Sequence, residues 1–267
     1  DLVSKSGFTG TDSTEMVSSN LNEMIGRSHR YDAELNKIQA RVLDFAEKSC
    51  EIANKRISIE NIANPDKLKH KKLMEIRNYQ VEAFFEMVQG NRIINLPTGV
   101  GKTHIATHTM DWFLYEHPDK IAVFVVTATT LISQQADHFQ NYSRFPPEAA
   151  GISIGASSSE SSAVVNGKDG TLVVYRIKGG DSLDIDLVKE QLAMGQRVII
   201  VIIHELLYNA LNHADSEGNE KLKLPRDLLS IIIFDECHHA IKEHPYARTL
   251  RDCFEGMSDA IKPRLAG

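Results

Sequence analysis

A glycine-rich segment that ends in a lysine and a threonine is the first feature of this chain that could do chemistry. Residues Leu96–Thr103 read Leu-Pro-Thr-Gly-Val-Gly-Lys-Thr, between a short apolar run, Ile93–Leu96, and a helix-like stretch, Thr103–Leu114. Glycines let successive backbone N–H groups turn toward one point, and the positive end of the following helix is directed at the same point. This order of strand, loop and helix predicts a phosphate-binding loop.

The side chains of the loop suit a nucleoside triphosphate. Lys102 could reach the β- and γ-phosphates, and the Thr103 hydroxyl could ligate Mg²⁺. The backbone of the remaining loop residues would cradle the ligand: Pro97, Thr98, Gly99, Val100 and Gly101. The first position of the usual pattern is Leu96 instead of glycine. A chance glycine turn before an amphipathic helix therefore stays open as an alternative.

Two adjacent carboxylates form the second chemical feature. Ser230–Phe234 is typical of a buried strand, and Asp235 and Glu236 follow it directly. One acid could hold Mg²⁺ while the other orients and deprotonates an attacking water molecule. Ligands of an open parallel sheet bind outside the carboxyl ends of its strands. We therefore expect Lys102 and both carboxylates to converge on one triphosphate–magnesium pocket.

Gln80 is a weaker candidate. It lies in Arg77-Asn78-Tyr79-Gln80, immediately before the helical pattern Val81–Val88. A glutamine amide presents one donor and one acceptor side by side, so it could read an adenine edge. The alternative is a surface residue at an ordinary helix start, which composition alone favours.

Histidines supply two further hypotheses. His104 and His108 are one helical turn apart, as metal ligands can be, but the sequence offers no third ligand beside them. His238 and His239 follow the acidic pair, where an imidazole could link the nucleotide site to a partner surface.

Composition indicates an ordinary globular protein. The 267 residues carry a formal charge of −6, and 42% are hydrophobic and 25% charged. Such a balance argues against coating nucleic acid by bulk charge, although a local basic groove is compatible with it. Cys50, Cys237 and Cys253 match neither a disulfide framework nor a zinc pattern. No signal segment or membrane-length apolar run is present, so we expect an intracellular protein, cytoplasmic or nuclear.

Strand and helix patterns alternate along most of the chain. Further strands are expected at Ile121–Val126, Gly151–Gly155, Leu172–Tyr175 and Arg197–Ile203. Helices are expected at 183–194, 205–211 and from Pro245 to about Met257. Such alternation predicts an α/β fold with a mostly parallel sheet.

The N-terminal part has a different character. Residues 1–20 show no apolar period, whereas Asp32–Arg56 has the spacing of a long amphipathic helix that could dock or bind a partner. We expect residues 1–70 to form a partly disordered extension and residues 71–267 one domain. The chain lacks an initiator methionine and ends on an apparent approach to another strand, so we expect a fragment.

Taken together, these features resemble the first RecA-like domain of a superfamily 2 helicase or translocase. The matching motifs are the Q motif, motif I, motif Ia and a DExH motif II, at Arg77–Gln80, Leu96–Thr103, Thr127–Gln135 and Asp235–His238. The finer resemblance is to Dicer helicase domains and related double-stranded-RNA-sensing helicases. It is carried by Phe234–Ala240, His244-Pro245-Tyr246 and Pro263–Gly267, and it covers about residues 74–267.

The resemblance implies a RecA-like P-loop NTPase fold, preceded by a helical extension, and an ATP hydrolase that uses ATP and Mg²⁺. Gln80 with help from Arg77 would contact adenine, and Lys102 the phosphates. Thr103 and Asp235 would hold Mg²⁺, largely through water. Glu236 would activate the attacking water.

The same resemblance implies partners. Double-stranded RNA is favoured over DNA, and a second RecA-like domain with an arginine finger would follow Gly267. Because such a finger supplies roughly 10³–10⁵ in rate, this piece alone should bind ATP, hydrolyse it weakly and unwind nothing. Two positions depart from the family pattern: Thr127 replaces a proline, and Ile202 replaces a threonine expected near the nucleic-acid backbone.

Two rival functions remain. A DNA translocase of superfamily 2 carries the same motifs. An ATP-binding interaction module that no longer hydrolyses could use the helix 32–56 as a partner surface, although intact Lys102, Asp235 and Glu236 count against it.

Overall fold

The computed structural model describes residues 12–63, 72–147, 170–181, 183–212, 224–240, 243–258 and 261–267, with the backbone alone for 12–32 and 239. The chain divides into two compact units, residues 1–44 and 45–267, so the boundary expected near residue 70 falls inside the second unit. The strand expected at 151–155 lies outside the described residues. None of the described helices is both long and apolar enough to cross a membrane.

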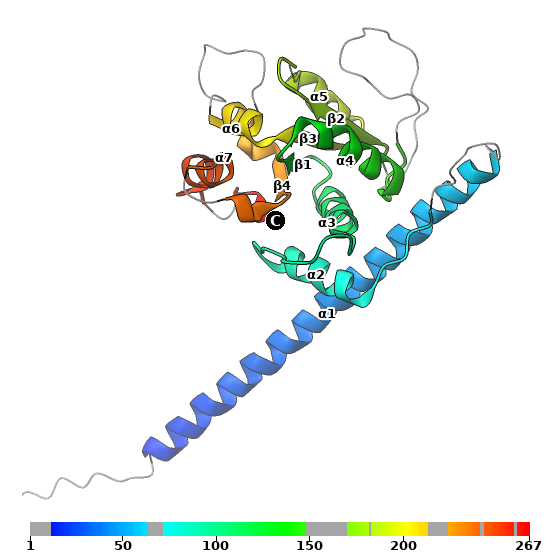
Figure 1. The fold of residues 1–267 in the computed structure, drawn as a ribbon. Helices are drawn as coiled ribbons and strands as arrows, with labels where there is room; N and C mark the ends of the chain where they lie inside the picture. The colour runs from blue at the N-terminus through cyan, green and yellow to red at the C-terminus, as the bar shows by residue number, and fades with distance from the viewer. Residues whose placement is uncertain are drawn as a thin grey trace, which may run out of the picture. The chain divides into compact units, whose positions relative to one another are not determined.

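A five-stranded parallel sheet is the centre of the second unit (Figure 1), which confirms the expected α/β fold. Its strands are β1 (Ile121–Val126), β2 (Leu172–Ile177), β3 (Arg197–Ile203), β4 (Leu229–Phe234) and β5 (Arg264–Ala266). They lie in the order β2–β3–β1–β4–β5, and every pair is parallel. Parallel neighbours need helical crossovers, and the helical patterns between the strands supply them.

The strand predicted before the glycine loop is only partly formed. Arg92 makes an isolated parallel bridge to Ala266. The Ile94 N–H donates to the Gly267 carbonyl oxygen at 2.7 Å, and the Gly267 N–H donates to the Arg92 carbonyl oxygen at 3.1 Å. The segment therefore continues the sheet beyond β5, but Pro97 has no N–H with which to extend the ladder.

The helices of the second unit begin and end close to the predicted positions, except that the sequence predicts no helix at Thr129–Tyr142. They are α2 (Asn78–Gln89), α3 (Lys102–Glu116), α4 (Thr129–Tyr142), α5 (Ile185–Ala193), α6 (His204–Asn212), α7 (Pro245–Arg248) and the π-helix η3 (Thr249–Phe254). The helix expected from Pro245 to Met257 is thus short and continues in π-helical geometry.

Alternate side chains of each strand reach opposite faces of the sheet. On one face, Val123 of β1 and Ile200 of β3 share an apolar core with Leu207 of α6 and Phe254 of η3. On the other face, the ring of Phe124 packs edge-on against that of Phe139 in α4, with centroids 5.0 Å apart. Helices therefore cover both faces and leave the strand ends free to carry a site.

The helix α1 extends from Asp12 to Ala63, so it begins about twenty residues before the predicted position and includes part of the segment expected to be irregular. Within the second unit its residues from Phe45 onward pack against the sheet domain. The Phe45 ring lies edge-on to Trp112, with centroids 5.1 Å apart. Arg56 donates to the carbonyl oxygens of Asn141 at 2.7 Å and Ser143 at 3.0 Å, at the end of α4. Half of the expected docking helix is thus part of the domain itself.

Candidate nucleotide-binding site

The glycine loop has the left-handed turns that its glycines predict. Gly99 has φ +82° and Gly101 has φ +87°, a region that other residues avoid at a cost of about 1–2 kcal/mol. Gly101 also lies directly before α3, and a Cβ built there would come within 2.5 Å of the Gln80 amide nitrogen. Glycine at position 101 is therefore required by both the backbone and the packing.

The acidic pair follows β4 in a tight turn. The Asp235 N–H donates to the Val125 carbonyl oxygen at 2.9 Å, which extends the pairing of β4 with β1 by one residue. Glu236 has φ +51° and ψ +43°, and it is the only non-glycine residue with positive φ in the described ranges. Strain of this kind is held by the surrounding structure and is common at functional sites.

Lys102 and Glu236 meet, although 134 positions separate them. The ammonium Nζ lies 3.2 Å from Glu236 Oε1, and His238 Nδ1 lies 3.3 Å from Glu236 Oε2. Lys102, Thr103, Asp235 and Glu236 line one cavity of about 290 Å³. The expected convergence of the lysine with both carboxylates is thus present in the fold.

Pairing at the end of the sheet brings the two motifs together. Segment 92–94 bonds to Gly267, β5 pairs with β4, and β4 leads into Asp235. Gly267 also lines the cavity, and a Cβ there would come within 2.6 Å of the Cys237 Cβ. β5 therefore lies between the loop segment and the acidic strand and fixes the distance between them.

Gln80 is buried, not a surface residue. It is 3% exposed, and its amide nitrogen donates to the Val100 carbonyl oxygen at 3.1 Å while its amide oxygen accepts from the Arg77 N–H at 2.9 Å. The Tyr79 hydroxyl donates to the same Val100 oxygen at 2.6 Å. Both side chains thus hold the loop by its backbone, and an adenine contact by Gln80 stays a prediction.

Most of the predicted nucleotide-binding residues line one of two hollows. Arg77, Gln80 and the loop residues Gly99, Val100 and Gly101 line a cavity of about 410 Å³, together with His104 and Tyr142. Pro97 and Thr98 are exposed and line neither cavity. The phosphate end and the expected base end of the site are therefore separate compartments.

Tyr246 is a residue to which the sequence assigned no role. Its side chain is 1% exposed, and its hydroxyl donates to the Asp235 carbonyl oxygen at 2.9 Å. The His244 Nδ1 accepts from the Tyr246 N–H at 3.2 Å and caps α7. The signal in the sequence is the motif His244-Pro245-Tyr246, which carries part of the resemblance to Dicer helicase domains.

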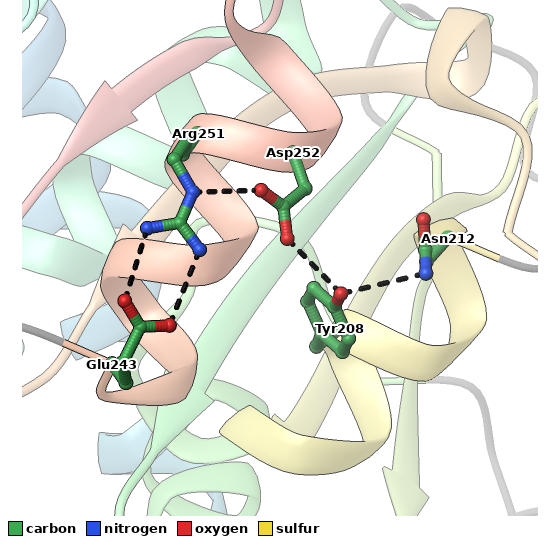
Figure 2. A network of polar contacts seen from close by, with 5 residues as sticks. All are labelled: Tyr208, Asn212, Glu243, Arg251 and Asp252. Carbon is green, nitrogen blue, oxygen red and sulfur yellow. Dashed lines mark hydrogen bonds and ion pairs between the residues drawn. The ribbon is translucent and has the colours of Figure 1, made fainter.

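A polar network holds the segment after Tyr246 against α6 (Figure 2). Arg251 contacts both Glu243 and Asp252, and Asp252 accepts from the Tyr208 hydroxyl at 3.0 Å. The Arg248 guanidinium lies 4.1 Å from the centre of the Tyr208 ring. Individual surface pairs contribute little, but this set links η3 and α7 to α6, and through Tyr246 to the acidic turn.

Burial and neighbouring charges affect the ionisation of Asp235. Burial raises the pKa of Asp235, and the Glu236 charge raises it further, while Lys102 lowers it. A bound cation would reverse this effect, because it favours the ionised carboxylate. A metal ion beside Asp235 would therefore offset the effect of burial on its carboxyl group.

The hypothesis of a metal site at His104 and His108 finds no support. In the part of the chain that the structure describes, no group of three or more His, Cys, Asp or Glu residues could hold a metal. His104 packs instead against His138, with ring centroids 4.8 Å apart, and His108 Nε2 lies 3.7 Å from Cys50 Sγ.

The residues present fit a magnesium-bound triphosphate. The first N–H groups of α3 have no acceptor within the helix and point at the loop. The Thr103 hydroxyl and the Asp235 carboxylate line one cavity and are the hard oxygen ligands that Mg²⁺ prefers. Lys102 provides the cation that phosphate oxygens require.

The family described as "Type III restriction enzyme, res subunit" matches residues 73–262. The chain belongs to this family. The helicase domain is also similar to Dicer-like protein 1 of Aspergillus clavatus, 29% identical over 203 residues, which are 73% of this chain and 11% of that protein. It is 23% identical to Endoribonuclease Dicer homolog 1 of Arabidopsis thaliana over 251 residues, 92% of this chain and 11% of the relative.

The match to the Arabidopsis thaliana relative spans 251 residues, so it includes part of the chain before residue 73. The similarity therefore extends beyond the limit expected at about residue 74. The chain spans about a tenth of the length of these curated relatives. Among solved structures, the Pyrococcus furiosus Hef helicase domain has the same fold, with a TM-score of 0.50 and 21% identity over 72% of this chain and 32% of that chain. The chain is a superfamily 2 helicase domain with a RecA-like fold, and its sequence is similar to those of Dicer-like proteins.

Proposed function

We propose that this helicase domain binds Mg²⁺-ATP in the cavity between the glycine loop and the acidic turn, and hydrolyses it when the rest of the protein is present. The observation that carries the proposal is the 3.2 Å contact between Lys102 Nζ and Glu236 Oε1. A phosphate-binding cation and a candidate base thereby lie at one point of the sheet edge.

Each side chain has a distinct task in this proposal. Lys102 binds the β- and γ-phosphates, and a bound triphosphate competes with Glu236 for its ammonium group. Thr103 and Asp235 hold Mg²⁺, largely through water, and Glu236 orients and deprotonates the attacking water. The magnesium ion, when bound, neutralises negative charge on the phosphate oxygens. Gln80 and Arg77 contact adenine from the second hollow.

We further propose that ATP hydrolysis is coupled to double-stranded RNA, in a role related to RNA silencing. The support is the similarity to two relatives whose names are Dicer-like protein and Dicer homolog. Hydroxyl and amide side chains of 127–135 follow β1, and β1 ends at the same sheet edge as β4. Such groups suit contacts with a phosphate backbone. Ile202 is 1% exposed within the core and offers no polar contact.

Full activity requires parts that this chain does not contain. A second RecA-like domain would supply an arginine finger, so the chain by itself should hydrolyse ATP weakly and unwind no duplex. The helix 32–56 is proposed as a surface for a protein partner along its residues before Phe45. The expected compartment is the cytoplasm or nucleus.

Calorimetry with ATP tests the first proposal. We expect this chain to take up one ATP in the presence of Mg²⁺ and much less in EDTA. No magnesium-dependent uptake would overturn the assignment. Uptake without turnover in the full-length protein would favour a non-hydrolysing interaction module.

DNA translocation is the second candidate, because the matched family is named after a restriction enzyme subunit. The ATPase rate of the full-length protein with duplex RNA or duplex DNA of equal length distinguishes the two. Greater stimulation by DNA would reject the RNA proposal and leave the nucleotide site unaffected.

A further inference from the structure

A third hollow lies at the amino-terminal ends of the strands, whereas the nucleotide site lies at their carboxyl ends. Its volume is about 490 Å³, and it is lined by residues at the amino-terminal ends of three strands. Lys120 directly precedes β1, Ser230 lies at the start of β4, and Lys262 and Arg264 flank Pro263 at the start of β5. Because Asp235 follows the other end of β4, this hollow is separate from the ATP cavity.

Three cations line this hollow, and none of them has a counter-ion among the described residues. Lys120, Lys262 and Arg264 form no ion pair with any of the described residues, and no described residue that lines the hollow is acidic. All three are partly buried. Positive charges placed around one cavity attract an anion, so this arrangement would stabilise an anion bound there.

Within the described part of the chain, the Arg264 side chain lacks a hydrogen-bond acceptor for one of its nitrogen atoms. Its Nε is buried and has no hydrogen-bond acceptor among the described residues, and leaving a buried donor unsatisfied is unfavourable. Burial and repulsion from Arg92 lower the pKa of Arg264. The Phe113 ring, 5.8 Å from the guanidinium carbon, compensates only in part.

The end of α3 does not account for this charge. The helix ends at Glu116, and His117 at its C-cap also lines the hollow. A helix C-terminus carries about half a negative elementary charge, whereas the three side chains carry about three positive charges. Most of the positive charge around the hollow therefore has no partner among the described residues.

We propose that this hollow, the Arg264 cavity, binds a small phosphorylated anion. Arg and Lys together are the side chains suited to phosphate oxygens, and three cations match a ligand with about three negative charges. A single carboxylate would leave the charge largely unbalanced. A concave hollow of this volume suits a small molecule, whereas a nucleic-acid backbone needs an extended charged groove.

Inorganic pyrophosphate is the probe for the Arg264 cavity. Calorimetry is done at constant ionic strength in EDTA with the Lys102→Ala variant, so that the nucleotide loop does not contribute and the result is independent of the ATP proposal. We expect one bound pyrophosphate. The substitutions Arg264→Gln and Lys120→Gln plus Lys262→Gln should each weaken binding at least tenfold. Lys178→Gln, which removes an exposed lysine elsewhere, should leave it unchanged.

Thermal melting of every variant controls for folding. If Arg264→Gln lowers the melting temperature, the double lysine variant, which leaves Arg264 and its packing in place, decides the outcome. Absence of pyrophosphate binding overturns the proposal, and so does binding that persists in the double lysine variant. A short RNA duplex is titrated in parallel. If the duplex binds through these three residues and pyrophosphate does not, the small-ligand assignment is wrong.

Discussion

The Tyr246 hydroxyl donates a 2.9 Å hydrogen bond to the backbone carbonyl oxygen of Asp235. The same hydroxyl lies 3.3 Å from the carbonyl oxygen of Val125, on the neighbouring strand. One buried side chain thus ties the acidic turn to the sheet. Its position in the fold makes it a candidate for positioning the carboxylates of the proposed nucleotide site.

Replacing Tyr246 with phenylalanine tests this role. Tyr246→Phe should lower the free energy of unfolding by about 1–3 kcal/mol, because a buried carbonyl loses its donor. The kcat for ATP in the full-length protein should fall by about tenfold with a nearly unchanged KM, because small displacements of catalytic groups slow chemistry more than binding. Tyr208→Phe, which removes a surface hydroxyl of the network in Figure 2, is the matched control. Equal kcat values for the two variants would refute the role.

Two glycines of the loop should differ in their tolerance of alanine. Both have positive φ, but a Cβ at Gly99 meets nothing within 4 Å, whereas one at Gly101 meets the Gln80 amide. Gly101→Ala should therefore weaken Mg²⁺-ATP binding at least tenfold in calorimetry, and Gly99→Ala clearly less. Identical losses for the two glycine variants would show that backbone strain alone matters.

Removing either partner of the Lys102–Glu236 contact should have opposite effects on binding. Lys102→Ala should weaken Mg²⁺-ATP binding at least tenfold, because a charge-assisted phosphate contact is lost. Glu236→Gln should bind ATP as well as the wild type or better, because the competing carboxylate is gone. It should reduce kcat of the full-length protein by about 10²–10⁴ if Glu236 is the base. Lys178→Ala serves as the control, and weaker ATP binding by Glu236→Gln would contradict this account.

Buried histidines near the loop should make the fold acid-sensitive. Burial lowers the pKa of His108 to about 4 and that of His138 to about 3. These folded-state pKa values lie below the unfolded value of about 6.5. As the pH falls below 6.5, the unfolded chain therefore binds protons that the native chain does not bind, and the free energy of unfolding decreases. Each histidine should contribute a slope of about 1.4 kcal/mol per pH unit.

Denaturant titrations between pH 7.5 and 4.5 measure how the free energy of unfolding depends on pH. His138→Phe should reduce this slope by the contribution of one histidine, about 1.4 kcal/mol per pH unit. The phenylalanine ring keeps the aromatic packing against Tyr142, whose ring centroid lies 4.7 Å away. Asp111 opposes the trend, because burial raises its pKa to about 7, but it is common to both proteins and cancels in the comparison. Parallel pH profiles for the two proteins would rule out titration of His138 as the cause.

Local patterns predicted the strands and helices well. β1 and β3 have the predicted bounds, since apolar runs of six or seven residues suffice to identify buried parallel strands. The segment before the loop was predicted as a strand, but it has only isolated pairing because its partner β5 is three residues long. The helix α1 was predicted too short, because apolar spacing is absent from its first part.

The sequence by itself determined the loop, the acidic pair and the alternation that places them at one edge of a parallel sheet. These follow from glycine conformations and apolar periodicity, which are local properties. Only the tertiary structure decided that Gln80 and Tyr79 donate hydrogen bonds to the Val100 carbonyl oxygen and that Tyr246 donates one to the Asp235 carbonyl oxygen. It also decided that three cations line the Arg264 cavity. Each of these contacts joins separate segments of the sequence. They therefore depend on how the chain packs in three dimensions, which the residue order within one segment does not determine.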